Sequence, residues 1–157
     1  MMVSLLIRWV HFVAGIAWIG LLYYFNWVLA PFLKEADAAT KRKVIQGLLP
    51  RALLWFRWSA LLTVVAGGTL LGRVGLNTPL LIGASLGFFM LLNTWLVIWP
   101  HQQKVLRLYA ESAARGTPLP AVLTLHERVV SAATRVNFYL SFPTLLFMGM
   151  SAHFPQF

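Results

Sequence analysis

The sequence predicts an all-α integral membrane protein, folded as a four-helix bundle in one domain over residues 1–157. Of its 157 residues, 59% are hydrophobic and only 11% are charged, with a mean hydropathy of +0.74. Soluble domains carry about a quarter charged residues, so this composition favours a membrane protein. Four apolar stretches have the length that crosses a hydrocarbon core of about 30 Å, at about residues 4–31, 53–71, 80–99 and 129–152.

The first apolar stretch is the longest and has one face of mixed character. Helical spacing places a small residue, a large aromatic residue and two polar residues together. These residues are His11, Gly15, Trp18, Leu22 and Asn26. Small and polar side chains are typical of contacts between membrane helices. We therefore expect this face to point toward protein and not toward lipid.

The polar segment after the first span predicts a short cytoplasmic amphipathic helix. Apolar Val44, Ile45, Leu48 and Leu49 form a stripe opposite Lys41, Arg42, Lys43 and Gln46. That pattern suits a helix lying in the headgroup plane, although a solvated loop with a hydrophobic turn is the alternative. Pro50 is expected to end this helix before the second span.

The remaining spans carry signals of packing and of helix ends. Gly68-x-x-x-Gly72 and Gly83-x-x-x-Gly87 predict close approach between helices, without indicating any chemistry. Thr78 is expected to cap the third span, with Pro79 at its first position. The polar segment after Pro100 can continue the third helix out of the membrane. Pro143 is expected to kink the fourth helix.

Basic residues are distributed unequally between the two sides of this bundle. The loops after the first and third spans hold Lys34, Lys41, Arg42, Lys43, Arg51, Lys104, Arg107, Arg115 and Arg128. The other side has only Arg8 and Arg73. The positive-inside rule therefore predicts cytoplasmic long loops, with both termini outside.

Charge and cysteine content exclude several classes of function. The net charge of +9 would suggest a nucleic-acid partner in a soluble chain. Here the basic residues lie in loops between apolar spans, so we expect the lipid bilayer as partner and no nucleic acid. The absence of cysteine excludes disulfides, thiolate metal sites and c-type haem attachment. We expect no metal site.

Two arginines lie inside predicted spans. Arg57 and Arg135 would cost about 3 kcal/mol or more each if uncompensated, so we expect them to face the bundle interior or a wet cavity. Two guanidinium groups together could hold a carboxylate, a quinone oxygen, a haem propionate or a planar anion. The alternative is that both extend to nearby headgroups. Asn93, Asn137 and His101 lie toward the same side and complete the candidate anion, substrate or lipid site.

His11 is the best single candidate for an axial haem ligand. A helical bundle with two facing histidines can hold b-type haem, and His153 is the candidate partner on the same outer half. The alternative is a buried histidine that is simply hydrogen-bonded. His101 and His126 form a second pair at the cytoplasmic boundary, which we interpret as interfacial. No general-base carboxylate lies in the spans, so catalytic residues are not identified.

Four stretches together resemble one family. They are HFVAGIAWIGLLYYFN, LPRALLWFRWSALLTVVAG, NTWLVIWPHQQK and RVNFYLSFPTLLFMGMSAHF. In this order they are similar to the N-terminal membrane domain of the bacterial membrane-bound urate oxidase (urate hydroxylase) family, from His11 to Phe154. The resemblance implies a multi-span bundle in the bacterial inner membrane. Full-length members add a cytochrome c domain on the outer side, whereas this sequence resembles a short stand-alone version without it.

Three functions remain open at the level of sequence. The first is a non-catalytic accessory subunit of a larger membrane electron-transfer complex, with other membrane subunits or further copies of the chain as partners. The second is a urate-oxidising module that passes electrons to an external cytochrome. The third is a small b-type cytochrome that uses His11. Without a cytochrome domain, independent urate oxidase activity is not expected, and no cofactor other than haem b is indicated.

Overall fold

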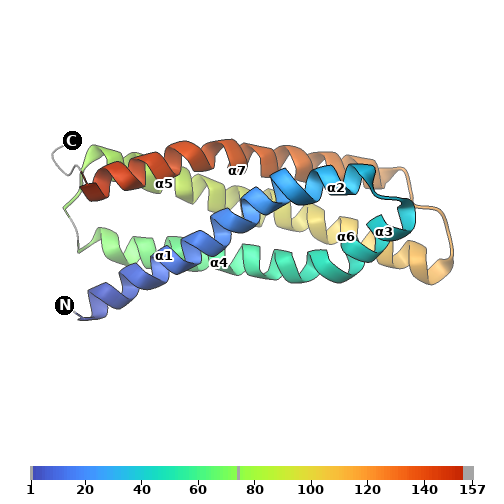
Figure 1. Cartoon of the computed structure of the whole chain (residues 1–157), viewed down its shortest axis with the longest axis horizontal. Helices are drawn as coiled ribbons and strands as arrows, with labels where there is room; N and C mark the ends of the chain where they lie inside the picture. The colour runs from blue at the N-terminus through green and yellow to red at the C-terminus, as the bar shows by residue number, and fades with distance from the viewer. Residues whose placement is uncertain (1, 74, 154–157) are drawn as a thin grey trace.

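The computed structural model describes residues 2–73 and 75–153, and these residues form helices and short connections without a strand. The all-α prediction is therefore confirmed for the described part of the chain. The elements join end to end into four rods (Figure 1). The rods are α1 (Met2–Tyr23), η1 (Tyr24–Leu29) and α2 (Ala30–Glu35); α3 (Ala38–Lys43), η2 (Val44–Leu48) and α4 (Leu49–Leu71); α5 (Thr78–Asn93), η3 (Thr94–Ile98) and α6 (Trp99–Arg115); and α7 (Val122–His153).

Among the described residues, three rods are long and apolar enough to cross a membrane: Met2–Glu35, Ala38–Leu71 and Thr78–Arg115. A helix of 34 residues is roughly 50 Å long at about 1.5 Å per residue, so each rod can extend beyond a hydrocarbon core of about 30 Å. The fourth rod, α7, has the required length but is not among the three. Its middle carries polar side chains that lower its hydropathy, including Arg135, Asn137, Ser141 and Thr144.

The rods pack as two pairs. The first rod crosses α4 diagonally, while α5 lies along α7 (Figure 1). The predicted protein-facing side of the first span is confirmed, because Trp18 and Leu22 are buried. A Cβ added at Gly15 would lie 3.7 Å from the Thr63 methyl group, so the two helices are in ordinary contact there.

Each of the three membrane-length rods widens into a π turn immediately before a proline. In every case the residue preceding the proline donates its N–H to the carbonyl five residues back: Ala30 to Phe25, Leu49 to Val44 and Trp99 to Thr94. Proline lacks an N–H, and its ring clashes with the carbonyl four residues back in an α-helix. The wider π turn moves that carbonyl aside, so the rods continue through Pro31, Pro50 and Pro100.

The π turn η2 corrects the prediction for residues 41–50. The structure has no separate helix there; α3, η2 and α4 form one rod from Ala38 to Leu71. Pro50 does not end the helix, because η2 accommodates it. Asp37 caps the start of this rod, because its carboxylate accepts the N–H groups of Ala39 and Thr40. The hydrogen bonds from Thr40 hold the pKa of Asp37 below its usual value.

The other signals of helix ends and packing have mixed outcomes. Asn77, and not Thr78, caps α5 by accepting the Leu80 N–H, because its side chain precedes the first turn. The continuation of the third helix beyond Pro100 is confirmed. Gly83 packs against Met148 of α7, as the glycine spacing predicted. A Cβ added at Gly68 or Gly72 would meet no atom within 4 Å. α7 runs through Pro143 without interruption.

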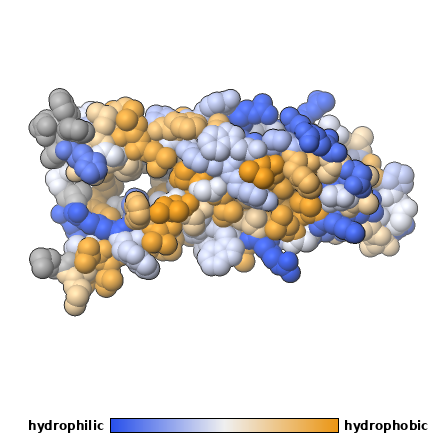
Figure 2. All heavy atoms as spheres, in the orientation of Figure 1, coloured by the Kyte–Doolittle hydropathy of each residue, from blue (hydrophilic) through white to orange (hydrophobic). Residues whose placement is uncertain are grey.

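The hydropathy of the surface changes along the bundle (Figure 2). Hydrophilic residues gather toward the end where the α2–α3 and α6–α7 connections lie, and apolar residues cover much of the remaining face (Figure 2). Figure 2 also shows a hollow between the two helix pairs near the end that carries both described termini. The polar end is the one predicted to lie in the cytoplasm.

Candidate functional site

A cavity of about 470 Å³ lies inside the bundle at the level of the three π turns. Every rod contributes to its wall, and η1, η2 and η3 each provide at least one buried side chain. π turns are frequently found at functional sites because they re-aim side chains locally. Most of the wall is apolar, formed by Phe25, Leu29, Leu33, Ile45, Leu49, Leu53, Phe56, Ile98, Val105 and Val130.

Two buried polar side chains line this cavity. Gln102 of α6 is 5% exposed and Thr134 of α7 is 9% exposed. Within residues 2–73 and 75–153, neither the Gln102 amide nor the Thr134 hydroxyl has a hydrogen-bond partner. Most buried polar groups in proteins are paired, so these two are available to a molecule inside the cavity.

The rim of the cavity carries three charged side chains, Lys34, Lys41 and Glu127. Lys41 of α3 lies 3.5 Å from the Glu127 carboxylate of α7. The Tyr109 hydroxyl of α6 donates to the same carboxylate at 3.2 Å. Glu127 therefore ties three rods together around the opening. The Asn26 amide donates to the Leu22 carbonyl of its own helix, leaving its oxygen free to accept.

Asn93 and Asn137, both predicted as site residues, lie in contact. The Asn93 amide donates to the Asn137 side-chain oxygen at 2.7 Å and to the Ala133 carbonyl at 2.9 Å. Asn137 is fully buried and donates to the Met90 carbonyl and the Thr94 hydroxyl, each at 3.0 Å. The side-chain amide groups of both asparagines thus donate hydrogen bonds that join α5 and the start of η3 to α7.

Arg57 lies among three tryptophans. Its guanidinium carbon is 3.8 Å from the ring centroid of Trp99, 4.9 Å from that of Trp95 and 5.1 Å from that of Trp58. Trp95 and Trp99 are one helical turn apart, so both rings reach the same side. Cation–π attraction of this kind is worth about 2 kcal/mol or more when the groups are desolvated. We call Arg57 and these three residues the tryptophan cage.

Arg135 is engaged elsewhere. It is exposed on α7, and its guanidinium group donates to the Ser131 hydroxyl at 3.4 Å on the same helix. The structure therefore holds the two arginines by separate contacts, one by aromatic rings and the other by its own helix. An anion site shared by Arg57 and Arg135 stays a prediction.

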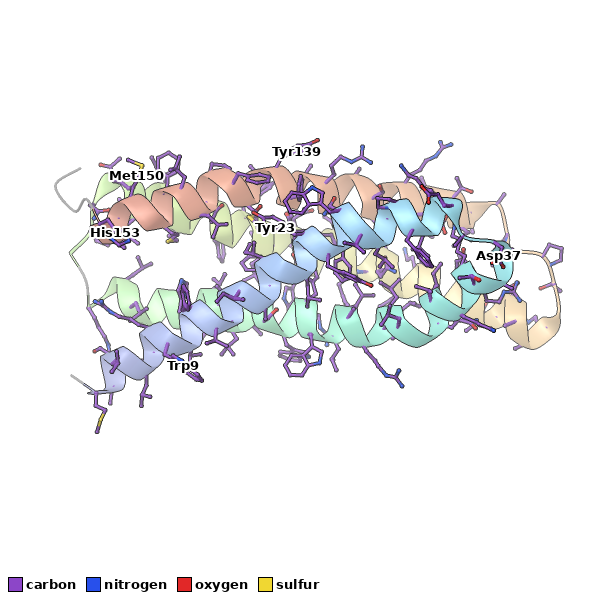
Figure 3. All side chains as sticks on the ribbon, viewed as in Figure 1. Trp9, Tyr23, Asp37, Tyr139, Met150 and His153 are labelled. Atoms are coloured by element: carbon purple, nitrogen blue, oxygen red, sulfur yellow. The ribbon has the colours of Figure 1, made fainter. Side chains whose placement is uncertain are left out.

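His11 packs in a tight contact between α1 and α4. Its Nδ1 lies 2.7 Å from the Thr63 carbonyl. A Cβ added at Gly67 would come within 2.8 Å of the His11 ring, so only glycine leaves room for it. His153 lies exposed at the last turn of α7, at the end of the bundle (Figure 3). The haem-ligand role of these two histidines stays a prediction.

His101 and His126 form a direct pair between α6 and α7. Their Nδ1 atoms are 3.0 Å apart, and the rings meet edge to face at 5.0 Å. Such a bond needs one protonated and one unprotonated nitrogen. Desolvation lowers the pKa of His126, and the charges of Lys104 and His101 lower it further. The interfacial position of this pair at the membrane boundary stays a prediction.

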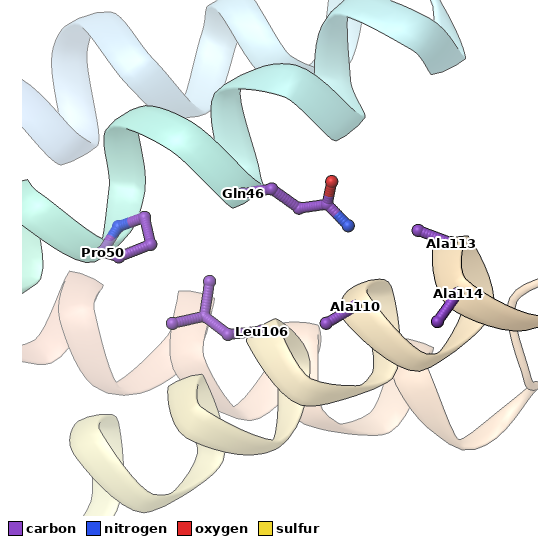
Figure 4. A pocket seen from close by; sticks show the side chains of 6 residues that line it. All are labelled: Gln46, Pro50, Leu106, Ala110, Ala113 and Ala114. Carbon is purple, nitrogen blue, oxygen red and sulfur yellow. The ribbon is translucent and has the colours of Figure 1, made fainter.

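A second hollow is an open groove of about 620 Å³ between η2 and α6 (Figure 4). The side chains of Ala110, Ala113 and Ala114 form one wall. Gln46 spans the groove and donates to the Tyr109 carbonyl at 3.0 Å. The lining holds no ionisable side chain, so the groove is a packing feature. Within the described ranges, no three histidines or carboxylates cluster in a way that could hold a metal ion.

Sequence reasoning missed the cavity, the tryptophan cage and the role of Thr94. The spacing of Ile98, Gln102 and Val105 was a usable signal, because it places a polar residue on an otherwise apolar helix face. The spacing of Trp95 and Trp99, one turn apart, was a second signal. The cavity itself depends on how four rods meet, which no local pattern encodes.

The fold and these contacts define an all-α helical bundle with rods of membrane-spanning length and polar interhelical contacts. Residues 1–48 match the sequence model of the family described as urate oxidase N-terminal. This match confirms the resemblance within residues 1–48. Beyond residue 48 the resemblance stays a prediction, and Phe154, its last residue, lies outside the described residues. No curated protein and no solved structure matches the chain.

Proposed function

We propose that the protein is an accessory, non-catalytic subunit of a bacterial inner-membrane electron-transfer complex. The observation that carries this proposal is the outward face of α4. Gly68 and Gly72 have open space at their Cα atoms, and large apolar side chains stand exposed on the same helix, including Trp55, Leu62 and Val65. Small residues at this spacing let a second helix approach closely in a membrane.

The hydrogen bonds and aromatic contacts made by polar residues of the spans support the same proposal. The Asn93 and Asn137 amides donate hydrogen bonds within the bundle, and the Arg57 guanidinium group lies against the tryptophan cage. The amide donors of both asparagines are therefore engaged within the bundle, whereas the Arg57 Nε has no hydrogen-bond partner within the described residues. For the two asparagines, these contacts favour a structural role over anion binding.

The proposed orientation places the polar connections in the cytoplasm. The rim residues Lys34 and Lys41 and the basic end of α6 then lie on the side where positive loops are retained. Both termini lie outside. A reporter fused after residue 153 that is active only in the periplasm would support this topology, and one active only in the cytoplasm would contradict it.

The test of the main proposal is copurification from native membranes in mild detergent. A specific set of membrane proteins should copurify with the wild-type chain. Gly68→Ile should reduce their recovery, because a branched side chain keeps a partner helix at a distance. Gly20→Ile is the matched control, since Gly20 on α1 is equally open. Equal recovery with all three chains would contradict a partner seated on α4.

A haem b role for His11 is the second candidate, and one observation favours it. A carbonyl only accepts, so the 2.7 Å contact with Thr63 fixes the proton on Nδ1 and leaves the Nε2 lone pair available. Iron-ligating histidines are oriented in this way. Nε2 of His11 would hold the iron, with His153 as the proposed second ligand. Bound haem would supply one-electron transfer.

A reduced-minus-oxidised spectrum of the purified chain separates these candidates. A b-type haem signal that disappears in His11→Ala but persists in His101→Ala would support the second candidate. A colourless preparation would exclude it and leave the subunit proposal. Reduction of an added cytochrome by urate would instead indicate a urate-oxidising module.

A further inference from the structure

We propose that the cavity at the π turns binds a membrane-soluble quinone, an uncharged carbonyl-bearing ring with an apolar tail. The inference goes beyond the subunit role, because binding can be measured on the isolated chain whether or not a complex exists. It starts from the size and walls of the cavity. A space of about 470 Å³ is in the range of small-molecule sites, and its wall is apolar except at a few points.

The apolar part of the wall suits a ring and a hydrocarbon chain. Phe25 and Phe56 meet edge to face with centroids 5.3 Å apart, and both line the cavity. Aliphatic side chains from η2, η3 and α7 complete the surface. Phe25, Leu53 and Ile98 lie near the cytoplasmic ends of the predicted spans, so a ligand held in the bilayer would reach this surface from the membrane boundary.

The polar part of the wall suits carbonyl oxygens. Gln102 and Thr134 are buried and line the cavity, and neither side chain is hydrogen-bonded within the described ranges. Leaving such groups unpaired in an apolar site is costly. The Gln102 amide and the Thr134 hydroxyl can both donate to a ligand acceptor. A quinone ring carries two carbonyl acceptors and otherwise needs only apolar contact.

The inner polar groups favour an uncharged head over an anionic one. Among the charged side chains that line the cavity, Lys41 is paired with Glu127 at 3.5 Å, and Lys34 makes no salt bridge within the described residues. The inner polar groups are a neutral amide and a neutral hydroxyl. An anion held by these two groups would lose its hydration without gaining a cationic partner from them, so binding to Lys34 is the competing outcome that the anionic probes test.

The experiment measures binding of decyl-ubiquinone to the purified full-length chain by calorimetry and thermal shift in detergent. Gln102→Leu and Thr134→Val should each weaken binding about 3- to 10-fold, since each removes one neutral hydrogen bond. Neither change breaks a bond within the described part of the protein, so the melting temperature without ligand should be unchanged or higher. Val130→Trp fills the cavity and should abolish binding. Thr69→Val is the matched control, because Thr69 lies outside the cavity and bonds only its own helix.

The outcomes separate a binding role from a structural one. Weaker binding with an intact fold in both polar variants supports the proposal. Wild-type affinity in the Gln102→Leu/Thr134→Val double variant, or in Val130→Trp, overturns it. Tighter binding of oleate or phosphatidylglycerol than of decyl-ubiquinone also overturns it, because the site would then select an anionic amphiphile. None of these results depends on whether other subunits copurify.

Discussion

The Asn93 amide donates to the Asn137 side-chain oxygen at 2.7 Å, and this bond joins α5 to α7 directly before the π turn of η3. Asn137 completes its pairing with Thr94, the first residue of that turn. The place where the third rod widens is therefore also where it is fixed to α7. Polar groups in the apolar interior of this bundle serve mainly to hold the rods in register, and the cavity lies next to this contact.

Loss of the Asn137 amide should destabilise the bundle. Asn137→Ala would leave the Asn93 amide, the Thr94 hydroxyl and the Met90 carbonyl with fewer partners. We expect a loss of about 2 kcal/mol, because polar contacts between membrane helices are worth roughly 0.6 to 1.7 kcal/mol each. Unfolding in detergent with increasing denaturant measures it. Asn93→Ala completes a double-mutant cycle, and strictly additive losses would show that the two amides are not coupled.

The contact between His11 and Gly67 predicts opposite effects at two adjacent glycines. Gly67→Ala places a methyl group within 2.8 Å of the imidazole, so the ring must move away from the Thr63 carbonyl and the protein should lose stability. Gly68→Ala meets open space and should be neutral or stabilise by up to about 1 kcal/mol through helix propensity. Thermal unfolding of both variants gives the comparison.

A His11→Ala background provides the control for the glycine pair. Without the imidazole, Gly67→Ala loses its obstacle and should behave as Gly68→Ala does. If Gly67→Ala destabilises both backgrounds equally, the imidazole is not the cause. The same variants bear on the haem candidate, since displacement of the ring would also alter any haem spectrum.

Helix periodicity predicted the helices and several of their contacts, because both depend on local spacing. The inward face of the first span follows from residues three or four apart on one apolar helix. Asn93 and Asn137 were predicted to lie toward the same side, but their pairing across two helices was not predicted. The π turns could not be predicted in the same way. Pro50 is a helix breaker by its local chemistry, and only the widened turn in η2 removes the clash.

The site was the least predictable part, because it arises from contacts between rods. Arg57 was expected to hold an anion or to extend to the headgroups, and the structure supplies three indole rings as its partners. The sequence does not show which side chains of other helices lie beside Arg57. Gln102 and Thr134 lie 32 residues apart and meet the same cavity only through the packing of α6 and α7.

The tryptophan cage predicts energetic coupling between Arg57 and Trp99. Trp99→Leu should destabilise the wild-type chain by about 1 to 2 kcal/mol more than it destabilises an Arg57→Met chain, which lacks the cation. Denaturant unfolding of the four proteins gives the coupling free energy. Trp55→Leu is a suitable control, because Trp55 is exposed and makes none of the cation–π contacts. Coupling near zero would indicate that Arg57 is available to another ligand.

The His101–His126 pair predicts loss of stability in mild acid. The pKa of His126 is lowered in the folded protein, so the unfolded chain binds more protons once the pH falls below about 6.5, the ordinary histidine value. Stability should therefore be constant above that pH, decline below it, and level off once the pH is below the folded pKa. Protonation of both rings also removes the acceptor needed for the 3.0 Å contact.

Thermal unfolding between pH 7.5 and 5 tests this pair. His126→Leu should flatten the pH dependence, because it removes the group whose pKa is shifted. His153→Leu should leave the dependence as in the wild type, since His153 is exposed at the opposite end of the bundle. A decline that persists unchanged in His126→Leu would assign the acid sensitivity to other groups. A decline that disappears in both variants would show that the two ends of the bundle titrate together.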